Sequence, residues 1–266
     1  MKRLIFASLL GCLLVFTSSF LATSRASAHQ TSQPGARAVN ATGQRITPRS
    51  ISHLPRRGNT QFISGNTSPE GGYITNAEGT SWVRGAQGIF HVVASAQSSP
   101  EYVTAVAVSN PSQGARIEVG IDQTHGQAYE YFQGWFGTNL FPVSPNDQVF
   151  ARILLNGNNQ WDIFIEDETS GRFFDEPYSY NTTIVRAEWF GEVLHGGPAP
   201  DTQVTFTDAH WLSNWAGWQP IWSGAARTVT QGYTEPSNGG AIGGGSLDSS
   251  STVFTLSSCS SLPCII

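Results

Sequence analysis

The chain has 266 residues, of which 12% are charged, and a formal net charge of −5. Residues 29–69 carry five arginines and no acidic residue, whereas residues 70–266 carry six arginines and all nineteen acidic residues. An acidic body repels nucleic acid and anionic membranes, so the composition disfavours both as partners. A body with few basic groups gains little net positive charge in acid, which favours work at low pH.

The chain opens with the pattern of a signal peptide. Lys2 and Arg3 precede a mostly apolar stretch at residues 4–21, and Ala26-Ser27-Ala28 forms a small-residue cleavage site. We therefore predict a signal peptide at residues 1–28 and a secreted protein. A lipoprotein anchor at Cys12 is a second interpretation of the same stretch. The rest of the sequence contains no run of the ~20 apolar residues that a spanning helix needs.

Residues 29–76 form a basic segment of low complexity, rich in Gln, Ser, Thr, Gly, Pro and Arg. It contains few large apolar residues, so it cannot bury enough surface to fold by itself. One interpretation is a linker. The other is a propeptide that lies on the acidic body until it is cleaved, with Arg56-Arg57 as a processing point.

From about residue 80 the sequence changes to short alternating runs separated by turn residues. We predict strands at residues 89–94, 102–108, 116–122, 128–136, 148–155, 161–166, 184–191, 203–206, 228–231 and 253–256. Many short strands at this spacing are typical of an all-β sandwich or barrel. We assign residues 77–258 to this domain and expect the Gly- and Ser-rich residues 236–251 to form a flexible loop.

Cysteine and histidine usage predicts no metal site. Cys259 and Cys264 lie in a C-terminal tail, residues 259–266, and an exported protein favours a disulfide between them. The six histidines are scattered and show none of the short spacings of zinc sites. We expect no metal or organic cofactor, and a monomer.

Three predicted strands place charged or aromatic side chains on one face, because successive strand residues point to opposite faces. In residues 186–192, Arg186, Glu188, Phe190 and Glu192 share a face, and Trp189 lies on the other. In residues 116–122, the polar face carries Arg116, Glu118 and Asp122. In residues 129–135, one face carries Tyr129, Tyr131, Gln133 and Trp135. These faces either line a common substrate groove or are ordinary solvent faces of a sandwich.

The same stretches resemble the glutamic peptidase (eqolisin) family of secreted acid endopeptidases, which have a lectin-like β-sandwich. Residues 186–192 resemble the family's Ala-Glu-(Trp/Phe)-x-x-Glu strand, and residues 204–208 resemble the strand after it. Residues 117–120 resemble its Gln-x-Gly strand, and residues 129–136 its aromatic strand. The match runs in order over residues 82–256. It implies an antiparallel β-sandwich of the concanavalin A-like jelly-roll type.

The resemblance also implies roles for individual residues. In that family a glutamate acts as general base and then as acid, while a glutamine facing it helps to hold the oxyanion. The glutamate corresponds to Glu192, but the position of the glutamine is occupied by Glu118. Gln133, Tyr131, Trp135 and Glu188 are the expected substrate contacts, and Gln133 is an alternative source of the missing amide. Gly191 stands where the family has a bulkier aliphatic residue.

Facing glutamates would share a proton, because two carboxylates at close range do not both ionise easily. Glu192 would then act as the base, and a protonated Glu118 as an acid or as a donor to the oxyanion. The preferred function is thus an acid endopeptidase with a polypeptide substrate.

Two other classes fit the same residues. Paired glutamates on a sandwich with aromatic platforms also describe glycoside hydrolases, which would take a glycan. A non-catalytic protein could instead bind peptides or glycans on four tryptophans that crowd one region. The alternative for these tryptophans, Trp211, Trp215, Trp218 and Trp222, is that they cap the core.

Overall fold

A computed structural model describes residues 60–61, 70–77, 82–98, 101–132, 135–194, 200–223, 226–234 and 241–260. They belong to the second of two compact units, Ala38–Ile266. The predicted signal peptide and most of the basic segment lie outside these residues. Within the described ranges, no helix is long and apolar enough to cross a membrane.

The described residues are almost entirely strands. They are β1 (Thr60–Gln61), β2 (Glu70–Ala77), β3 (Val83–His91), β4 (Tyr102–Asn110), β5 (Ala115–Asp122), β6 (Gln127–Phe132), β7 (Trp135–Pro142), β8 (Gln148–Leu155), β9 (Gln160–Asp167), β10 (Arg172–Ser179), β11 (Arg186–Val193), β12 (Thr202–Ser213), β13 (Gly217–Pro220), β14 (Ala226–Thr234), β15 (Ala241–Gly244) and β16 (Phe254–Cys259). Two short 3-10 helices, η1 (Ala94–Ser98) and η2 (Pro111–Gln113), complete this part.

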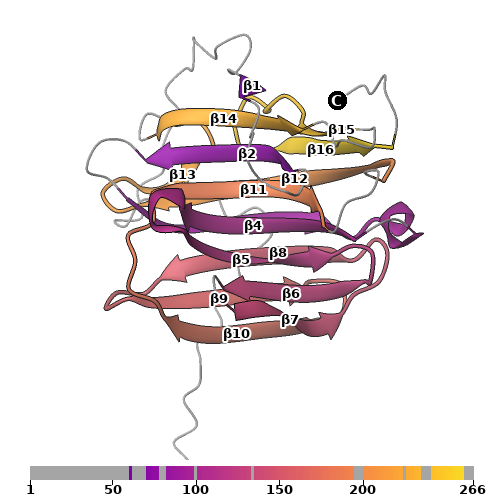
Figure 1. The fold of residues 1–266 in the computed structure, drawn as a ribbon, viewed down its shortest axis with the longest axis horizontal. Helices are drawn as coiled ribbons and strands as arrows, with labels where there is room; N and C mark the ends of the chain where they lie inside the picture. Colours follow the sequence, from indigo (N-terminus) through magenta and orange to yellow (C-terminus); the bar gives the residue numbers. More distant parts are fainter. Residues whose placement is uncertain are drawn as a thin grey trace, which may run out of the picture. The chain divides into compact units, whose positions relative to one another are not determined.

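The strands form a sandwich of two antiparallel layers. Hydrogen bonds connect them in the order β10-β9-β8-β3-β12-β16-β15-β14-β2-β11-β4-β5-β6-β7, with β13 beside β12 and β1 parallel to β14. One layer consists of β10, β9, β8, β3 and β12. The other consists of β14, β2, β11, β4, β5, β6 and β7, and β16 and β15 join the two layers. Figure 1 shows β14, β2, β11, β4, β5 and β6 following one another from top to bottom. The predicted fold class is therefore confirmed.

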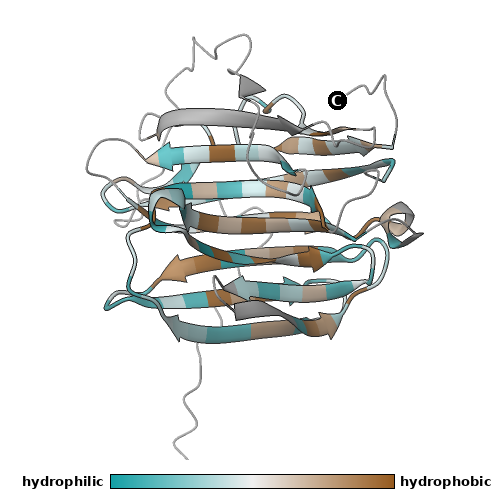
Figure 2. Ribbon diagram, viewed as in Figure 1, coloured by the Kyte–Doolittle hydropathy of each residue, from teal (hydrophilic) through white to brown (hydrophobic). Residues whose placement is uncertain are grey.

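The core lies between the layers and follows from the alternation of side chains. Strand β5 buries Ile117, Val119 and Ile121 completely, and β11 buries Ala187 and Trp189. Each large apolar side chain that is fully buried contributes about 1.5–3 kcal/mol. Brown and teal bands alternate along the strands in Figure 2, as expected for half-buried strands. The opposite face of β5 and β11 is therefore left for polar residues.

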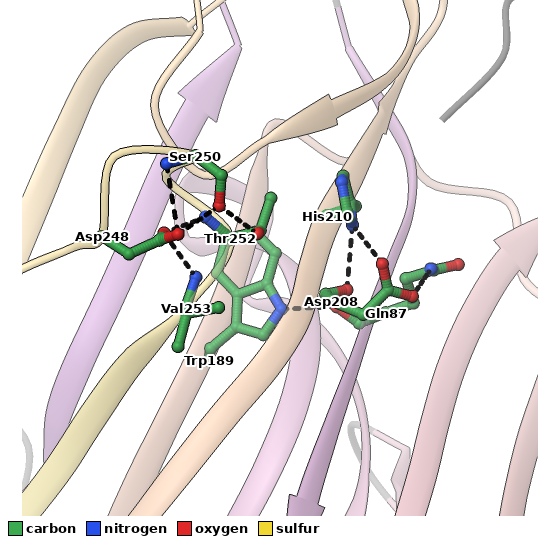
Figure 3. A network of polar contacts seen from close by, with 8 residues as sticks. All are labelled: Gln87, Trp189, Asp208, His210, Asp248, Ser250, Thr252 and Val253. Atoms are coloured by element: carbon green, nitrogen blue, oxygen red, sulfur yellow. Dashed lines mark hydrogen bonds and ion pairs between the residues drawn. The ribbon is translucent and has the colours of Figure 1, made fainter. Parts of the chain in front are cut away.

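Trp189 connects the two layers. Its Nε1 donates a hydrogen bond to the backbone oxygen of Gln87 in β3, at 2.7 Å. The Gln87 amide donates to Asp208 Oδ2 at 2.7 Å, and Asp208 Oδ1 lies 3.0 Å from His210 Nδ1 (Figure 3). The register of β12 against β3 shifts between Thr207 and His210, so these contacts fix a bulge beside the tryptophan. This arrangement anchors the strand that carries Glu188 and Glu192.

Strand β2 corrects the predicted domain boundary. It begins at Glu70, inside the segment that we assigned to a linker or propeptide, and it lies between β14 and β11. Strand β2 was not predicted from the sequence because it contains two glycines. A Cβ at Gly71 would lie 2.4 Å from the Ile242 oxygen, and Gly72 has φ +146° and would meet the Trp189 oxygen at 2.1 Å. Close backbone packing thus requires glycine in a buried strand.

Other strand boundaries also differ from the predictions. Strand β8 matches its prediction, whereas β10 and β13 were not predicted. The expected strand at residues 128–136 is a hairpin of β6 and β7, and β15 lies within the expected flexible loop. Cys259 is disulfide-bonded, and its predicted partner Cys264 lies outside the described residues.

The structure explains why glycine stands at position 191. A Cβ there would lie 2.5 Å from the hydroxyl oxygen of Tyr102 and 2.6 Å from Leu256 Cδ2. Both side chains are buried, so neither can move without disturbing the core. They fill the space that a bulkier residue would take in β11.

We expect Gly191→Ala to lower the free energy of unfolding by about 1–3 kcal/mol, because it overpacks this contact. Urea unfolding checks the value. Tyr102→Phe removes the hydroxyl, so the cost of Gly191→Ala should be smaller in that background. An equal cost in both backgrounds would contradict the explanation.

Candidate functional site

The face of the sheet opposite the core carries four glutamates and one arginine, which come from β2, β5 and β11. Glu188 is aligned through Ala107 of β4 with Glu118 of β5, and then with Tyr131 of β6. Glu192 is paired with Glu70 of β2. Directly opposed residues of antiparallel strands point to the same face. We call the face that carries Glu70, Arg116, Glu118, Glu188 and Glu192 the charged face.

The middle strand leaves room for these long side chains. On the charged face β4 presents Val103, Ala105 and Ala107, which are small and buried. They form a second apolar cluster with Phe190 and Tyr129, separate from the main core. The side chains of β11 and β5 therefore lie over β4 and approach one another across it.

Arg116 occupies the centre of the charged face. Its Nε lies 3.0 Å from Glu118 Oε2, and its Nη2 lies 3.2 Å from Glu70 Oε1 and 3.8 Å from Glu188 Oε2. The guanidinium carbon lies 4.5 Å from the centroid of the Phe190 ring, within the range of a cation–π contact. One cation thus joins carboxylates from three strands.

Hydroxyl groups complete the contacts of two of these carboxylates. Tyr129 donates a hydrogen bond to Glu118 Oε1, and Ser109 donates one to Glu188 Oε1. Hydrogen bonds to ionised groups are stronger than those between neutral groups, so each hydroxyl helps to fix its carboxylate.

Burial separates the glutamates into two kinds. Glu70 and Glu188 are each 4% exposed and Glu118 is 6% exposed. Glu192 is partly exposed, as is Tyr131. Glu192 is therefore the glutamate of the charged face that solvent reaches most easily.

Burial also shifts the ionisation of the cluster. It raises the pKa of Glu118 above the ordinary value of 4.5, and the Arg116 charge and the Tyr129 hydrogen bond oppose it only in part. Burial likewise raises the pKa of Glu70, against the lowering effect of Arg116 and with further raising by Glu188 and Glu118. Burial alone would lower the pKa of Arg116, but the surrounding glutamates hold it well above its ordinary range. Arg116 is therefore a permanent cation beside carboxyl groups that favour protonation.

Glu118 and Glu192 share the charged face, but they do not lie directly opposite each other as we expected. The residue aligned with Glu118 is Glu188, while Glu192 is aligned with Val103 and Asp122. Both glutamates act electrostatically on Arg116, which links them.

The expected substrate contacts are divided. Glu188 and Tyr131 lie in one row with Glu118. Gln133 lies outside the described residues. Trp135 begins β7 and is paired with Phe132 of β6, so it does not continue the strand of Tyr131 as we expected.

The central role of Arg116 and the presence of Glu70 on this face were not predicted from the sequence. Alternation placed Arg116 on a polar face, but it does not predict the distance from Arg116 to residues of other strands. Glu70 begins a strand that its two glycines concealed. Arg186 shares the face, but its Nε donates to Asn76 Oδ1 at 2.9 Å.

The tryptophans divide between the two interpretations. Trp211 is fully buried and donates a hydrogen bond to the Pro220 oxygen at 3.0 Å, so it belongs to the core. Trp215 is 62% exposed, and Trp218 and Trp222 are half-buried. Trp211 therefore contributes no ligand surface, and Trp215 presents the most open ring of the four.

One group of described residues has the composition of a metal site. Ligand atoms of Glu101, Asp122 and His125 lie within 4.8 Å of one another. However, Asp122 Oδ1 accepts hydrogen bonds from the backbone of Thr124 and His125, and its Oδ2 lies 2.6 Å from His125 Nδ1. These contacts explain the cluster as a cap of the turn between β5 and β6.

Comparison with known proteins connects this geometry to a fold family. No family model matches the sequence, and no curated protein matches it. The structure is similar to scytalido-glutamic peptidase with a peptide-based transition-state analogue: the TM-score is 0.57 at 15% identity, over 73% of this chain and 99% of that chain. This chain has the fold of the glutamic peptidases. It is also similar to SCP-B, a member of the eqolisin family in a complex with the tripeptide Ala-Ile-His, with a TM-score of 0.51 at 14% identity over the same shares. These likenesses support the resemblance seen in the sequence.

The raised pKa of Glu118 makes a prediction about stability. Because the folded-state pKa lies above 4.5, folding favours the protonated form, and stability is lost as pH rises through the folded-state pKa. Glu118→Gln carries no charge, so it should be more stable than the wild type at neutral pH. The two should be equally stable below pH 4.5. Each unit of pKa difference corresponds to about 1.4 kcal/mol.

Urea unfolding of both proteins at acid and neutral pH checks this prediction. The exposed Glu168 offers a matched control, because Glu168→Gln should change stability little at either pH. A Glu118→Gln variant that is less stable than the wild type at neutral pH would contradict the prediction.

Proposed function

We propose that the protein is a glutamic-type acid endopeptidase that hydrolyses peptide bonds on its charged face. The observation that carries the proposal is the gathering of three glutamates around Arg116, with Glu192 on the same face, on a sheet with the fold of the glutamic peptidases. The similar structures were solved with a peptide-based analogue and a tripeptide, which favours a polypeptide substrate over a glycan. We propose export through the predicted signal peptide.

In this proposal Glu192 is the general base. It is the partly exposed glutamate of the cluster, so water and a peptide can approach it. Its carboxylate takes a proton from water while the water oxygen forms a bond to the peptide carbon. The electron pair of the carbonyl double bond moves to the carbonyl oxygen.

Glu118 is the general acid. Its raised pKa favours the protonated form, which an acid needs at the start of the reaction. When the tetrahedral intermediate collapses, the bond from carbon to nitrogen breaks, and Glu118 gives its proton to the leaving nitrogen. Tyr131, aligned with Glu118 and partly exposed, is a substrate contact, and we propose Gln133 and Trp135 as further contacts. Glu188, held by Ser109 and Arg116, fixes the cluster.

A pH series tests the function. Purified protein is incubated with casein or denatured protein from acid to neutral pH, and new peptides are detected by mass spectrometry. We expect internal cleavage in acid, fading as pH rises through the pKa of Glu118. Absence of cleavage at every pH would overturn the proposal in favour of a binding protein. Release of sugar from polysaccharide would overturn it in favour of a glycoside hydrolase.

A further inference from the structure

Arg116 has a buried donor, Nε, without a hydrogen-bond acceptor beside the proposed catalytic glutamates. Its Nε is buried and lies 3.0 Å from Glu118 Oε2, but the two do not form an aligned hydrogen bond. Its ion pairs with described residues involve Nε and Nη2, so Nη1 has no carboxylate partner there. Buried donors without an acceptor are rare in native proteins and call for an explanation. A ligand oxygen beside the guanidinium would supply the acceptor.

The guanidinium is also fixed in position. Glu70, Glu118 and Glu188 surround it, and the Phe190 ring lies beneath it at 4.5 Å. A donor that is already oriented needs no reorganisation when charge develops nearby, which is the condition for strong transition-state stabilisation. Two hydroxyl donors on this face are already occupied, since Tyr129 donates to Glu118 and Ser109 donates to Glu188.

We propose that Arg116 stabilises the oxyanion that forms when water adds to the peptide carbonyl. This inference rests on the proposed function. When the carbonyl electron pair moves to oxygen, that oxygen becomes negatively charged beside the guanidinium and accepts a hydrogen bond from its free N–H. No proton leaves Arg116, so the residue binds the charge while Glu192 and Glu118 move the protons. In this assignment the glutamine amide that Glu118 replaces is not required. Arg116, two residues before Glu118 on the same strand face, binds the oxyanion instead.

Steady-state kinetics on a peptide substrate at acid pH tests the assignment. Arg116→Gln should lower kcat by about 10²- to 10³-fold with little change in KM, the loss typical of removing one oxyanion donor. Arg116→Lys keeps the charge without the planar fork, so its loss should be smaller. Arg186→Gln is the matched control, because Arg186 lies on the same face but contacts Asn76, and its kcat should stay unchanged.

Two further measurements separate catalysis from folding. Guanidinium ion at non-denaturing concentration should restore part of the kcat of Arg116→Ala, which a purely structural role would not allow. If Arg116→Gln is unstable, the Arg116→Gln/Glu118→Gln double variant removes a buried charge together with the cation and is compared with Glu118→Gln. A wild-type kcat in Arg116→Gln would overturn the role of Arg116 but not the proposed function. The same holds if the double variant loses no more kcat than Glu118→Gln does. An inactive wild type would overturn the proposed function and this assignment with it.

Discussion

Glu192→Gln is expected to lower kcat/KM for peptide hydrolysis in acid by about 10²- to 10⁴-fold, the range for loss of a general base. The substitution keeps the size and hydrogen-bonding shape of the side chain, but the amide cannot take a proton from water. Glu192 is partly exposed, so the fold should tolerate the change. Initial rates on an internally quenched peptide measure the effect.

Glu188→Gln is the informative comparison, because Glu188 rather than Glu192 is aligned with Glu118. Our assignment gives Glu188 a positioning role through Ser109 and Arg116, so its substitution should cost less activity than that of Glu192. Glu168→Gln, an exposed change at a turn, should leave the rate unchanged. A severe loss in Glu188→Gln together with an active Glu192→Gln would move the base to Glu188.

Arg116→Met is expected to cost about 3–5 kcal/mol of stability at neutral pH, because removing one partner of a buried ion pair leaves uncompensated charge. Three carboxylates lie within 3.8 Å of the guanidinium, so the loss affects all of them. The cost should shrink in acid. The folded-state pKa values of Glu70 and Glu118 are already raised, and both groups become neutral as pH falls through those values.

Urea unfolding at neutral and acid pH measures this dependence. Arg152→Met is the matched control, since Arg152 lies 5.3 Å from the centroid of the Phe164 ring and makes no ion pair with a described residue. Its substitution removes an arginine from an aromatic ring without exposing a buried carboxylate cluster. The same loss at both pH values in Arg116→Met would show that only packing was lost.

Alternation along single strands was enough to predict the composition of the charged face. In residues 186–192 it placed Glu188 and Glu192 together and Trp189 on the core side, and the structure shows both features. In residues 116–122 it placed Arg116 and Glu118 on one face. These predictions succeed because the two-residue period of a strand is local and needs no knowledge of neighbouring strands.

The relative positions of these residues could not be predicted in the same way. The alignment of Glu118 with Glu188 depends on the register of β11 and β5 against β4, and registers between distant segments leave no local signal. Strand β2 was not predicted because it contains Gly71 and Gly72, which allow close backbone packing with Ile242 and Trp189. The role of Arg116 depends on the packing of three strands, which places glutamates beside its guanidinium.

The dependence of kcat/KM on pH, measured for the wild type and Glu118→Gln, tests the central claim most directly. The claim is that Glu192 and a protonated Glu118 hydrolyse peptide bonds together. It predicts that wild-type activity falls as pH rises through the pKa of Glu118, which lies above 4.5. Glu118→Gln should be far less active and should lack this fall. Equal rates and the same pH dependence in both proteins would contradict the claim.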